Sequence, residues 1–353
     1  MLGIDRRAAR YAWTVALTVL LLYLVYLLRK TIFVFIVALL FAYLLSPLVN
    51  LLDRVLPIRA RAAALALAYI IFVGAVAFIG AQIGSRVVEQ ANTLVKAFPA
   101  MLKNWQNPSP GPHGTIDSLK EQAVSSVRNE IASRSGDIFA MASQAGLKVI
   151  GVASDLIYVV IIPILAFFFL KDGAVITQHL REIVNDGPRR ALVDDVMADI
   201  HLLLAHYVRA LVFLCLAVFG MYSIVFAIIG VPFPVLLGTV GGLLEFIPMI
   251  GPMVAGAVIL IVAGVSGAPV LSTLVFLLAY RMLQDYVVSP HLMGRGIQLH
   301  PVLIMFGVFA GAELAGIAGT FLSVPVLALV RVLYIRFRKA RLATRLSPEH
   351  VRI

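Results

Sequence analysis

Long apolar runs recur along almost the whole of this 353-residue chain, and they constrain its fold more than any other feature. An α-helix rises about 1.5 Å per residue, so about 20 apolar residues cross the roughly 30 Å hydrocarbon core of a bilayer. Eight runs are candidate spans: Tyr11–Leu28, Thr31–Leu52, Ala62–Ile83, Ile150–Leu170, His206–Ile229, Val235–Val265, Pro269–Val288 and Pro301–Ile335. The chain is therefore predicted to be an all-α, polytopic integral membrane protein with about eight transmembrane helices.

Composition excludes several other classes of protein. Only 13% of the residues are charged and 61% are hydrophobic, whereas about a quarter of a soluble domain is charged. The net charge of +11 comes from Lys and Arg clusters between the apolar runs, which argues against a nucleic-acid partner and leaves the lipid bilayer as the first partner. The single cysteine, Cys215, lies inside an apolar run, so the sequence offers no intramolecular disulfide and no cysteine-based zinc site.

The basic residues also predict how the spans are oriented. Four gaps are rich in Lys and Arg: Met1–Arg10 has three, Asp53–Arg61 three, Lys171–Ala205 four and Arg331–Ile353 seven. Because cytoplasmic loops carry the excess of basic residues, these gaps are predicted to be cytoplasmic. With an even number of spans, both termini then lie in the cytoplasm and the interval 84–149 lies outside.

The interval 84–149 has a helical pattern of its own. Two sets of apolar residues recur at helical spacing: Val87, Val88, Ala91, Leu94, Val95 and Phe98, then Ile116, Leu119, Ala123, Val124, Val127 and Ile131. A breaker-rich sequence at 107–112 separates them, which predicts an external helical hairpin. This hairpin is expected to pack on a neighbouring subunit or on the bilayer, and the alternative is a solvated hairpin with no dedicated role.

Four segments follow from these patterns. Residues 1–83 hold the first three transmembrane helices, and 84–149 form the external hairpin. Residues 150–335 hold the remaining spans with a cytoplasmic segment at 171–205, and 336–353 form a basic cytoplasmic tail. Spans rich in Gly and Ala, with uncovered apolar stripes, predict a homo-oligomer, and a pentamer is among the candidate assemblies.

Two of the apolar runs, Val235–Val265 and Pro301–Ile335, are too long and too interrupted to be plain spans. The interrupting residues are Pro248, Gly251 and Pro252 in the first run and Gly316, Gly319 and Pro325 in the second. Prolines lack the amide donor of a continuous helix, so broken or re-entrant helices are predicted in the C-terminal half. Non-helical backbone survives at membrane depth only where it is buried in protein or lines a wet cavity, and paired broken helices point to a transporter's binding site.

Two glutamates and an Arg–Asp pair lie within the last three runs. Glu245 precedes the first break and Glu313 the second. A carboxylate at membrane depth is costly unless it is paired, hydrated or protonated, so both are functional candidates; the alternative is that each caps a half-helix near the interface. Arg281 and Asp285 share a helix face, which favours a static ion pair over a gate that opens on protonation or cation binding.

Three further patterns do not lead to a catalytic or metal site. Lys171, Asp172 and Gly173 follow an aromatic stretch where a span meets the cytosol, and Gly173 is expected to end that helix. His201 and His206 do not share a helix face, so no metal site is predicted. Gly264–Gly267 matches the Gly-x-Ser-Gly motif of intramembrane serine proteases, but every histidine lies in a gap or at a span edge, so no enzyme is expected.

Several short motifs occur in an order typical of one family of permeases. They are Phe169–Gly173, Phe246–Pro252, Asp285–Gly294, Leu299–Pro301 and Gly316–Gly319 followed by Val324–Pro325. Over nearly its full length the chain resembles the autoinducer-2 exporter family, which includes PerM-like membrane transporters. The resemblance implies eight spans, breaks in the later half and a homo-oligomer. It also implies export of a small polar solute such as the autoinducer-2 quorum signal, or sodium (lithium)/proton antiport.

Residues and resemblance lead to one functional interpretation. The chain is expected to be a transporter of the bacterial cytoplasmic (inner) membrane with no cofactor. Because no nucleotide-binding loop is present, its transport is expected to be driven by an ion gradient or to run downhill. A channel-like pore and a non-transporting scaffold are the alternatives. The candidate pathway residues are Glu245, Pro248, Gly251, Pro252, Arg281, Asp285, Pro290, Glu313, Gly316 and Gly319, with Lys171, Asp172 and Gly173 at the cytoplasmic edge.

Overall fold

A computed structural model describes residues 6–55, 61–106, 156–182, 188–288 and 299–345. All regular structure in these ranges is helical, and no strand occurs among them. The helices are α1 (Arg6–Leu27), α2 (Arg29–Val55), α3 (Arg61–Gln106), α5 (Leu156–Glu182), α6 (Pro188–Ile229), α7 (Pro234–Leu244), α8 (Ile250–Val265), α9 (Val270–Leu283), the π-helix η2 (Gln284–Val288) and α11 (Pro301–Arg345). The predicted all-α class is confirmed.

Within these ranges, seven helical stretches are long and apolar enough to cross a membrane, and three shorter apolar helices accompany them. The seven lie in α1, α2, α3, α5, α6, α9 with η2, and the second part of α11. The short helices are 234–244, 250–265 and 301–316, which fall in the two runs predicted to be broken. The polytopic membrane fold with breaks in its C-terminal half is therefore confirmed.

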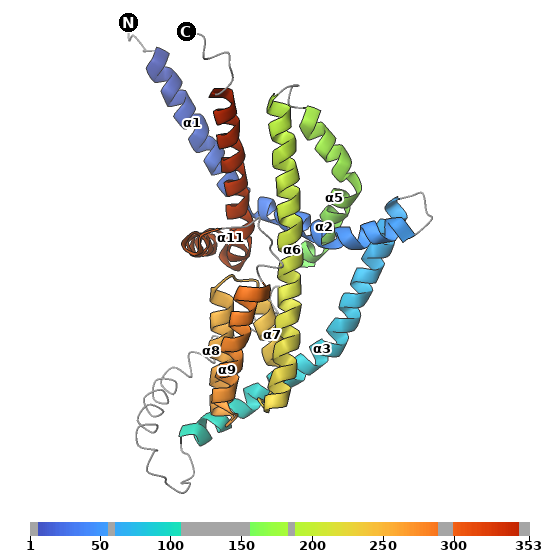
Figure 1. Ribbon diagram of the computed structural model, residues 1–353, viewed down its shortest axis with the longest axis vertical. Coiled ribbons are helices and arrows are strands. Elements are labelled where there is room, and N and C mark those ends of the chain that lie inside the picture. Colours follow the sequence, from blue (N-terminus) through green and yellow to red (C-terminus); the bar gives the residue numbers. More distant parts are fainter. Residues whose placement is uncertain (1–5, 56–60, 107–155, 183–187, 289–298, 346–353) are drawn as a thin grey trace.

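Helix α6 runs along the long axis of the molecule and connects two of its three apolar cores (Figure 1). Its first half packs through Tyr207 and neighbouring residues against α2 and α11. Its second half packs through Tyr222 and Phe226 against α7 and α9, in a core that residues of α8 complete. The third core lies between α2, α3 and α5.

Helix α7 lies against α6 at close range because three glycines face it. A Cβ atom on Gly242 would lie 2.7 Å from the Cys215 carbonyl oxygen, and one on Gly241 would lie 2.7 Å from the Tyr222 ring. Such contacts are too short for a side chain, so only glycine allows this approach. Helix α3 holds the other end of α7, where the Leu236 amide donates a 2.9 Å hydrogen bond to the Gln90 side-chain oxygen.

Helices α7 and α8 form a short hairpin that turns at residues 245–249. With 11 and 16 residues, they are about 17 and 24 Å long, and neither crosses a roughly 30 Å hydrocarbon core. The turn is sharp: Met249 has a positive φ of 64°, and a Cβ atom on Gly251 would overlap the Leu244 carbonyl oxygen. The pair therefore enters the protein and returns, as a re-entrant hairpin does.

Helix α11 contains the second break. Ala315 (φ −145°, ψ 20°) and Gly316 (φ 61°, ψ −142°) are not helical, and the two legs on either side fold back on each other. Gly311 and Gly319 face one another across this fold, where a Cβ atom on either would overlap the backbone of the other. The positive φ at Gly316 is one that glycine adopts without strain.

Helix α3 is a single helix of 46 residues that runs through position 84 without interruption. The first amphipathic stripe of the predicted external hairpin thus lies on the second half of α3, which continues the third span. The second stripe, at 116–131, lies outside the described residues, so the hairpin stays a prediction.

The expected helix end at Gly173 is wrong. Helix α5 continues through this glycine to Glu182, and the Thr177 hydroxyl donates to the Gly173 carbonyl oxygen at 2.8 Å. A glycine lowers the stability of a helix interior by only about 1 kcal/mol, and the sequence has no further proline before Pro188. Two more helical turns therefore form.

Candidate functional site

The candidate site lies where the α7–α8 hairpin meets the end of α9. Glu245 follows the last residue of α7, and its Oε1 atom accepts a hydrogen bond from Nε2 of Gln284, the first residue of η2. Gln284 is only 3% exposed, whereas Glu245 is half-buried. The first break therefore presents a carboxylate that is held by a buried amide.

Arg281 and Asp285 form an ion pair on the other side of the same helix. The Arg281 Nε atom lies 2.9 Å from Asp285 Oδ2, and the two side chains are 38% and 46% exposed. Their spacing of four residues predicts this pair, and the structure forms it. Both charges lie within electrostatic range of Glu245 without contacting it directly.

An aromatic cluster packs beside the carboxylate. Tyr222 and Phe226 of α6 contact Phe276 and Tyr280 of α9, with ring centroids 5.5 to 5.8 Å apart between the two helices. Both tyrosines lie within electrostatic range of Glu245. The cluster gives the site a rigid apolar wall and two hydroxyl groups.

The two helix breaks meet at the centre of the molecule. Phe246, next to Glu245, packs against Phe321 of α11 with ring centroids 5.6 Å apart. The Tyr207 hydroxyl of α6 donates to the Phe321 carbonyl oxygen at 3.2 Å, just beyond the second break. The two broken segments are therefore in direct contact, and α6 is hydrogen-bonded to the second.

The other predicted site residues are distributed as follows. Pro248 lies in the turn of the first hairpin, and Gly251 and Pro252 lie in the first turn of α8, where Gly251 approaches the end of α7. Glu313 is exposed on the first leg of α11 and has no hydrogen-bond or ion-pair partner among the described residues, so it is not brought together with Glu245. Pro290 lies outside the described residues.

The predicted cytoplasmic-edge residues Lys171, Asp172 and Gly173 lie inside α5, which packs on α2 and α3.

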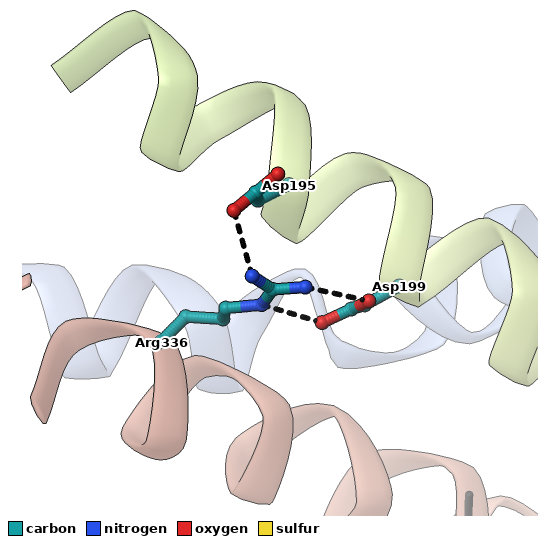
Figure 2. Close-up of polar contacts among 3 residues, drawn as sticks. All are labelled: Asp195, Asp199 and Arg336. Atoms are coloured by element: carbon teal, nitrogen blue, oxygen red, sulfur yellow. Dashed lines mark hydrogen bonds and ion pairs between the residues drawn. The ribbon is translucent and has the colours of Figure 1, made fainter. Parts of the chain in front are cut away.

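A separate set of ion pairs ties α6 to other helices. Arg336 of α11 contacts both Asp195 (2.6 Å) and Asp199 (2.7 Å), as Figure 2 shows.

The histidines and Ser266 have structural contacts. The Tyr43 hydroxyl and His201 Nδ1 are 2.6 Å apart, and the Ser266 hydroxyl donates to the Ala263 carbonyl oxygen at 3.1 Å where α8 ends. In the part of the chain that the structure describes, no three potential metal ligands lie together.

Gln284 is the functional candidate that the sequence analysis misses. The signal available was a polar side chain inside an apolar run, one position before Asp285. Its pairing with Glu245 was not visible, because 39 residues separate the two.

Comparison with known proteins decides the family. The family model described as AI-2E family transporter matches residues 15–339. The chain belongs to the AI-2E transporter family. It is 26% identical over 322 residues to YrrI of Bacillus subtilis, with 90% of this chain and 89% of that protein covered. YueF of the same organism is 26% identical over 321 residues, covering 86% and 84%.

A third relative is named as a permease. PerM of Escherichia coli K12 is 25% identical over 252 residues, which cover 70% of this chain and 66% of PerM. YrrI and YueF carry the name of transport proteins. This AI-2E family member is thus a multi-pass membrane protein of a transporter family.

Proposed function

We propose that the chain exports a small polar solute, such as the autoinducer-2 signal, and that an ion gradient drives the export. Family membership supports transport. The observation that carries the rest is the Glu245 carboxylate at the break between α7 and α8. Half-helix ends and freed backbone groups beside a charged side chain are the means by which secondary transporters bind solutes and ions.

Glu245 is the proposed coupling residue. Burial disfavours the charged form of a carboxylate, so Glu245 can take up a proton when its solute or cation leaves. Pro248, Gly251 and Pro252 keep the helix broken at this point, so the solute would meet a turn and two half-helix ends instead of a continuous helix.

The second break has a supporting role in this proposal. Gly316 and Gly319 leave half-helix ends in α11, and Glu313 lies close to them in the sequence. Because Glu313 is exposed and lacks the amide partner of Glu245, its contribution to coupling is the smaller one. The Arg281–Asp285 pair borders the pathway near the end of α9, and Pro290, which lies outside the described residues, stays a candidate from the sequence.

Sodium (lithium)/proton antiport is the second candidate function. It uses the same carboxylate, and carboxylate oxygens are ligands of the kind that hard cations prefer. The two candidates therefore differ in cargo and not in site.

We propose an orientation in the bacterial cytoplasmic membrane with both termini and 171–205 in the cytoplasm, and 84–149 outside. The basic gaps support it. So does the arrangement in Figure 1, where the start of α1, the end of α11 and the adjoining ends of α5 and α6 lie toward one end of the molecule.

Flux into proteoliposomes that hold the purified protein tests the proposal. Autoinducer-2 and sodium are each followed with no gradient, with a proton gradient and with a sodium gradient. The proposal expects saturable, gradient-accelerated flux of the solute. Sodium–proton exchange without solute flux would favour the antiporter, a current that does not saturate would favour a pore, and no flux of any kind would favour a scaffold.

A further inference from the structure

The amide of Gln284 is buried on the inward face of α9 and η2. The buried residues of this face are Thr273, Leu277, Tyr280 and Gln284. A buried polar group in a membrane helix is costly unless it is paired. Gln284 has such a partner in Glu245, at the apex of a different element.

The backbone at this point is also unusual. Gln284 begins the π-helix η2, and π-helical turns are rare and frequently found at functional sites. Arg281 and Asp285 pair with each other on the exposed side of the helix. Of these three polar residues, only Gln284 reaches the hairpin apex.

A glutamine amide suits a carboxyl group that changes its charge. Its NH₂ donates to a carboxylate, and its carbonyl oxygen accepts from a protonated carboxyl after the amide turns over. A cationic partner would hold Glu245 charged, and an apolar partner would leave either state without a hydrogen bond. The amide is thus compatible with repeated proton exchange.

Other titratable or charged groups surround Glu245 without bonding to it. They are Cys215 and Tyr222 of α6, and Tyr280, Arg281 and Asp285 from the α9–η2 segment. Cysteine and tyrosine are ordinarily uncharged at neutral pH, and Asp285 neutralises Arg281. Among the described residues, Gln284 is the one that hydrogen-bonds the Glu245 carboxylate.

We propose that Gln284 is a positioning residue that keeps Glu245 hydrogen-bonded in both of its protonation states and thereby sets the pH at which Glu245 exchanges its proton. This inference rests on the proposed coupling role of Glu245. It assigns a function to the contact between η2 and the hairpin apex.

Infrared titration of the full-length protein in liposomes tests the inference without any transported solute. The C=O stretch of protonated Glu245 is identified as the band that Glu245→Gln lacks. Gln284→Met keeps nearly the length and volume of the side chain and removes its hydrogen bonds. Both protonation states then lose a hydrogen bond, but the charged form loses the stronger one. The midpoint pH of the band is therefore expected to move up by about one unit.

A second variant and a control accompany the first. Gln284→Asn keeps an amide but is too short to reach Glu245, so a shift in the same direction is expected, and it remains informative if Gln284→Met does not fold. Gln178→Met is the control, because Gln178 donates a 2.9 Å hydrogen bond to Glu182 on an exposed face of α5. Gln178→Met removes the same kind of hydrogen-bonded pair and should leave the midpoint pH of the Glu245 band unchanged.

An unchanged midpoint in a folded Gln284 variant would overturn the inference. The pH profile of flux gives a second readout. In the Gln284 variants this profile should move to higher pH together with the midpoint of the infrared band. Loss of a merely structural contact would lower the flux without moving its pH profile. If Glu245→Gln keeps the gradient-driven flux of the wild type, the proposed coupling role fails, and the infrared band still decides whether Gln284 controls the titration of Glu245.

Discussion

At the scale of single residues, the hairpin apex depends on close approaches between backbone atoms. The α7–α8 turn brings the Leu244 carbonyl oxygen to the place where a Cβ atom on Gly251 would lie. A glycine farther along α8, Gly256, has open space around its Cβ position. The two glycines therefore offer a matched test of the turn.

Gly251→Ala is expected to destabilise the protein, because the added methyl group forces the two helices apart. Overpacking of this kind costs about 1–3 kcal/mol. Gly256→Ala should be neutral or slightly stabilising, since alanine favours a helix and meets nothing there. Thermal unfolding followed by fluorescence-detected size exclusion measures both, and equal melting temperatures for the two variants would contradict this account of the turn.

Residue contacts within one helix could be predicted from the sequence, whereas contacts between elements could not. Arg281 and Asp285 pair because a helix places residues four apart on one face. The hydrogen bond from Gln284 to Glu245 depends on how the α7–α8 hairpin folds against α9. No spacing in the sequence encodes that packing.

At the scale of elements, the sequence predicted the two breaks but not every continuous helix. Clustered Pro and Gly at 248–252 and glycines at 316–319 mark the breaks correctly. Isolated breakers are a weaker signal, because helices continue through Pro47, Pro99 and Pro163. The helix through Gly173 shows the same limit: one unfavourable residue does not by itself end a helix.

The last leg of α11 is fastened to α6 by the Arg336 ion pairs (Figure 2). Arg336→Ala is expected to lower stability by about 1 kcal/mol, because these pairs are partly exposed. Arg336→Lys should recover only part of the loss, since lysine lacks the planar fork that bridges two carboxylates. Arg338→Ala, which removes an exposed arginine of the same helix, is the control.

A double-mutant cycle between Arg336→Ala and Asp199→Ala measures the coupling between the two side chains directly. The coupling should shrink at high salt, because partly exposed charges are screened. Additive effects of the two substitutions at low salt would mean that the ion pair does not fasten α11 to α6.

At the scale of the whole molecule, the two hairpins affect the number of crossings. A hairpin that returns to the side it entered adds no crossing. If α7–α8 and the two legs of α11 behave in this way, the remaining six candidate spans leave both termini on one side of the membrane. This count agrees with the orientation that the basic residues predict.

Cysteine labelling tests the orientation. Asn104→Cys and Lys339→Cys, each made in a Cys215→Ala background, put single thiols on exposed positions of α3 and α11. A membrane-impermeant maleimide applied to spheroplasts should label the thiol at 104 and reach the one at 339 only after permeabilisation. The opposite pattern would reverse the proposed orientation.

Assembly is predicted from surfaces that a single copy leaves uncovered. None of the candidate span in α1 is buried in the protomer, and small residues elsewhere allow helices to approach closely. We expect a detergent-corrected mass that is a multiple of 38.2 kDa in mild detergents and in nanodiscs. A mass of one chain in all of them would exclude a stable homo-oligomer.

The central claim is that Glu245 couples an ion gradient to transport, and the flux of Glu245→Gln in proteoliposomes tests it most directly. The amide keeps the shape of the side chain but cannot ionise. Glu182→Gln, at an exposed carboxylate of α5, is the matched control. Glu245→Gln is expected to lose gradient-dependent flux with normal expression and oligomer size. Glu313→Gln should lose it less completely, and Glu182→Gln should resemble the wild type. Wild-type flux and pH dependence in Glu245→Gln would contradict a coupling role for Glu245.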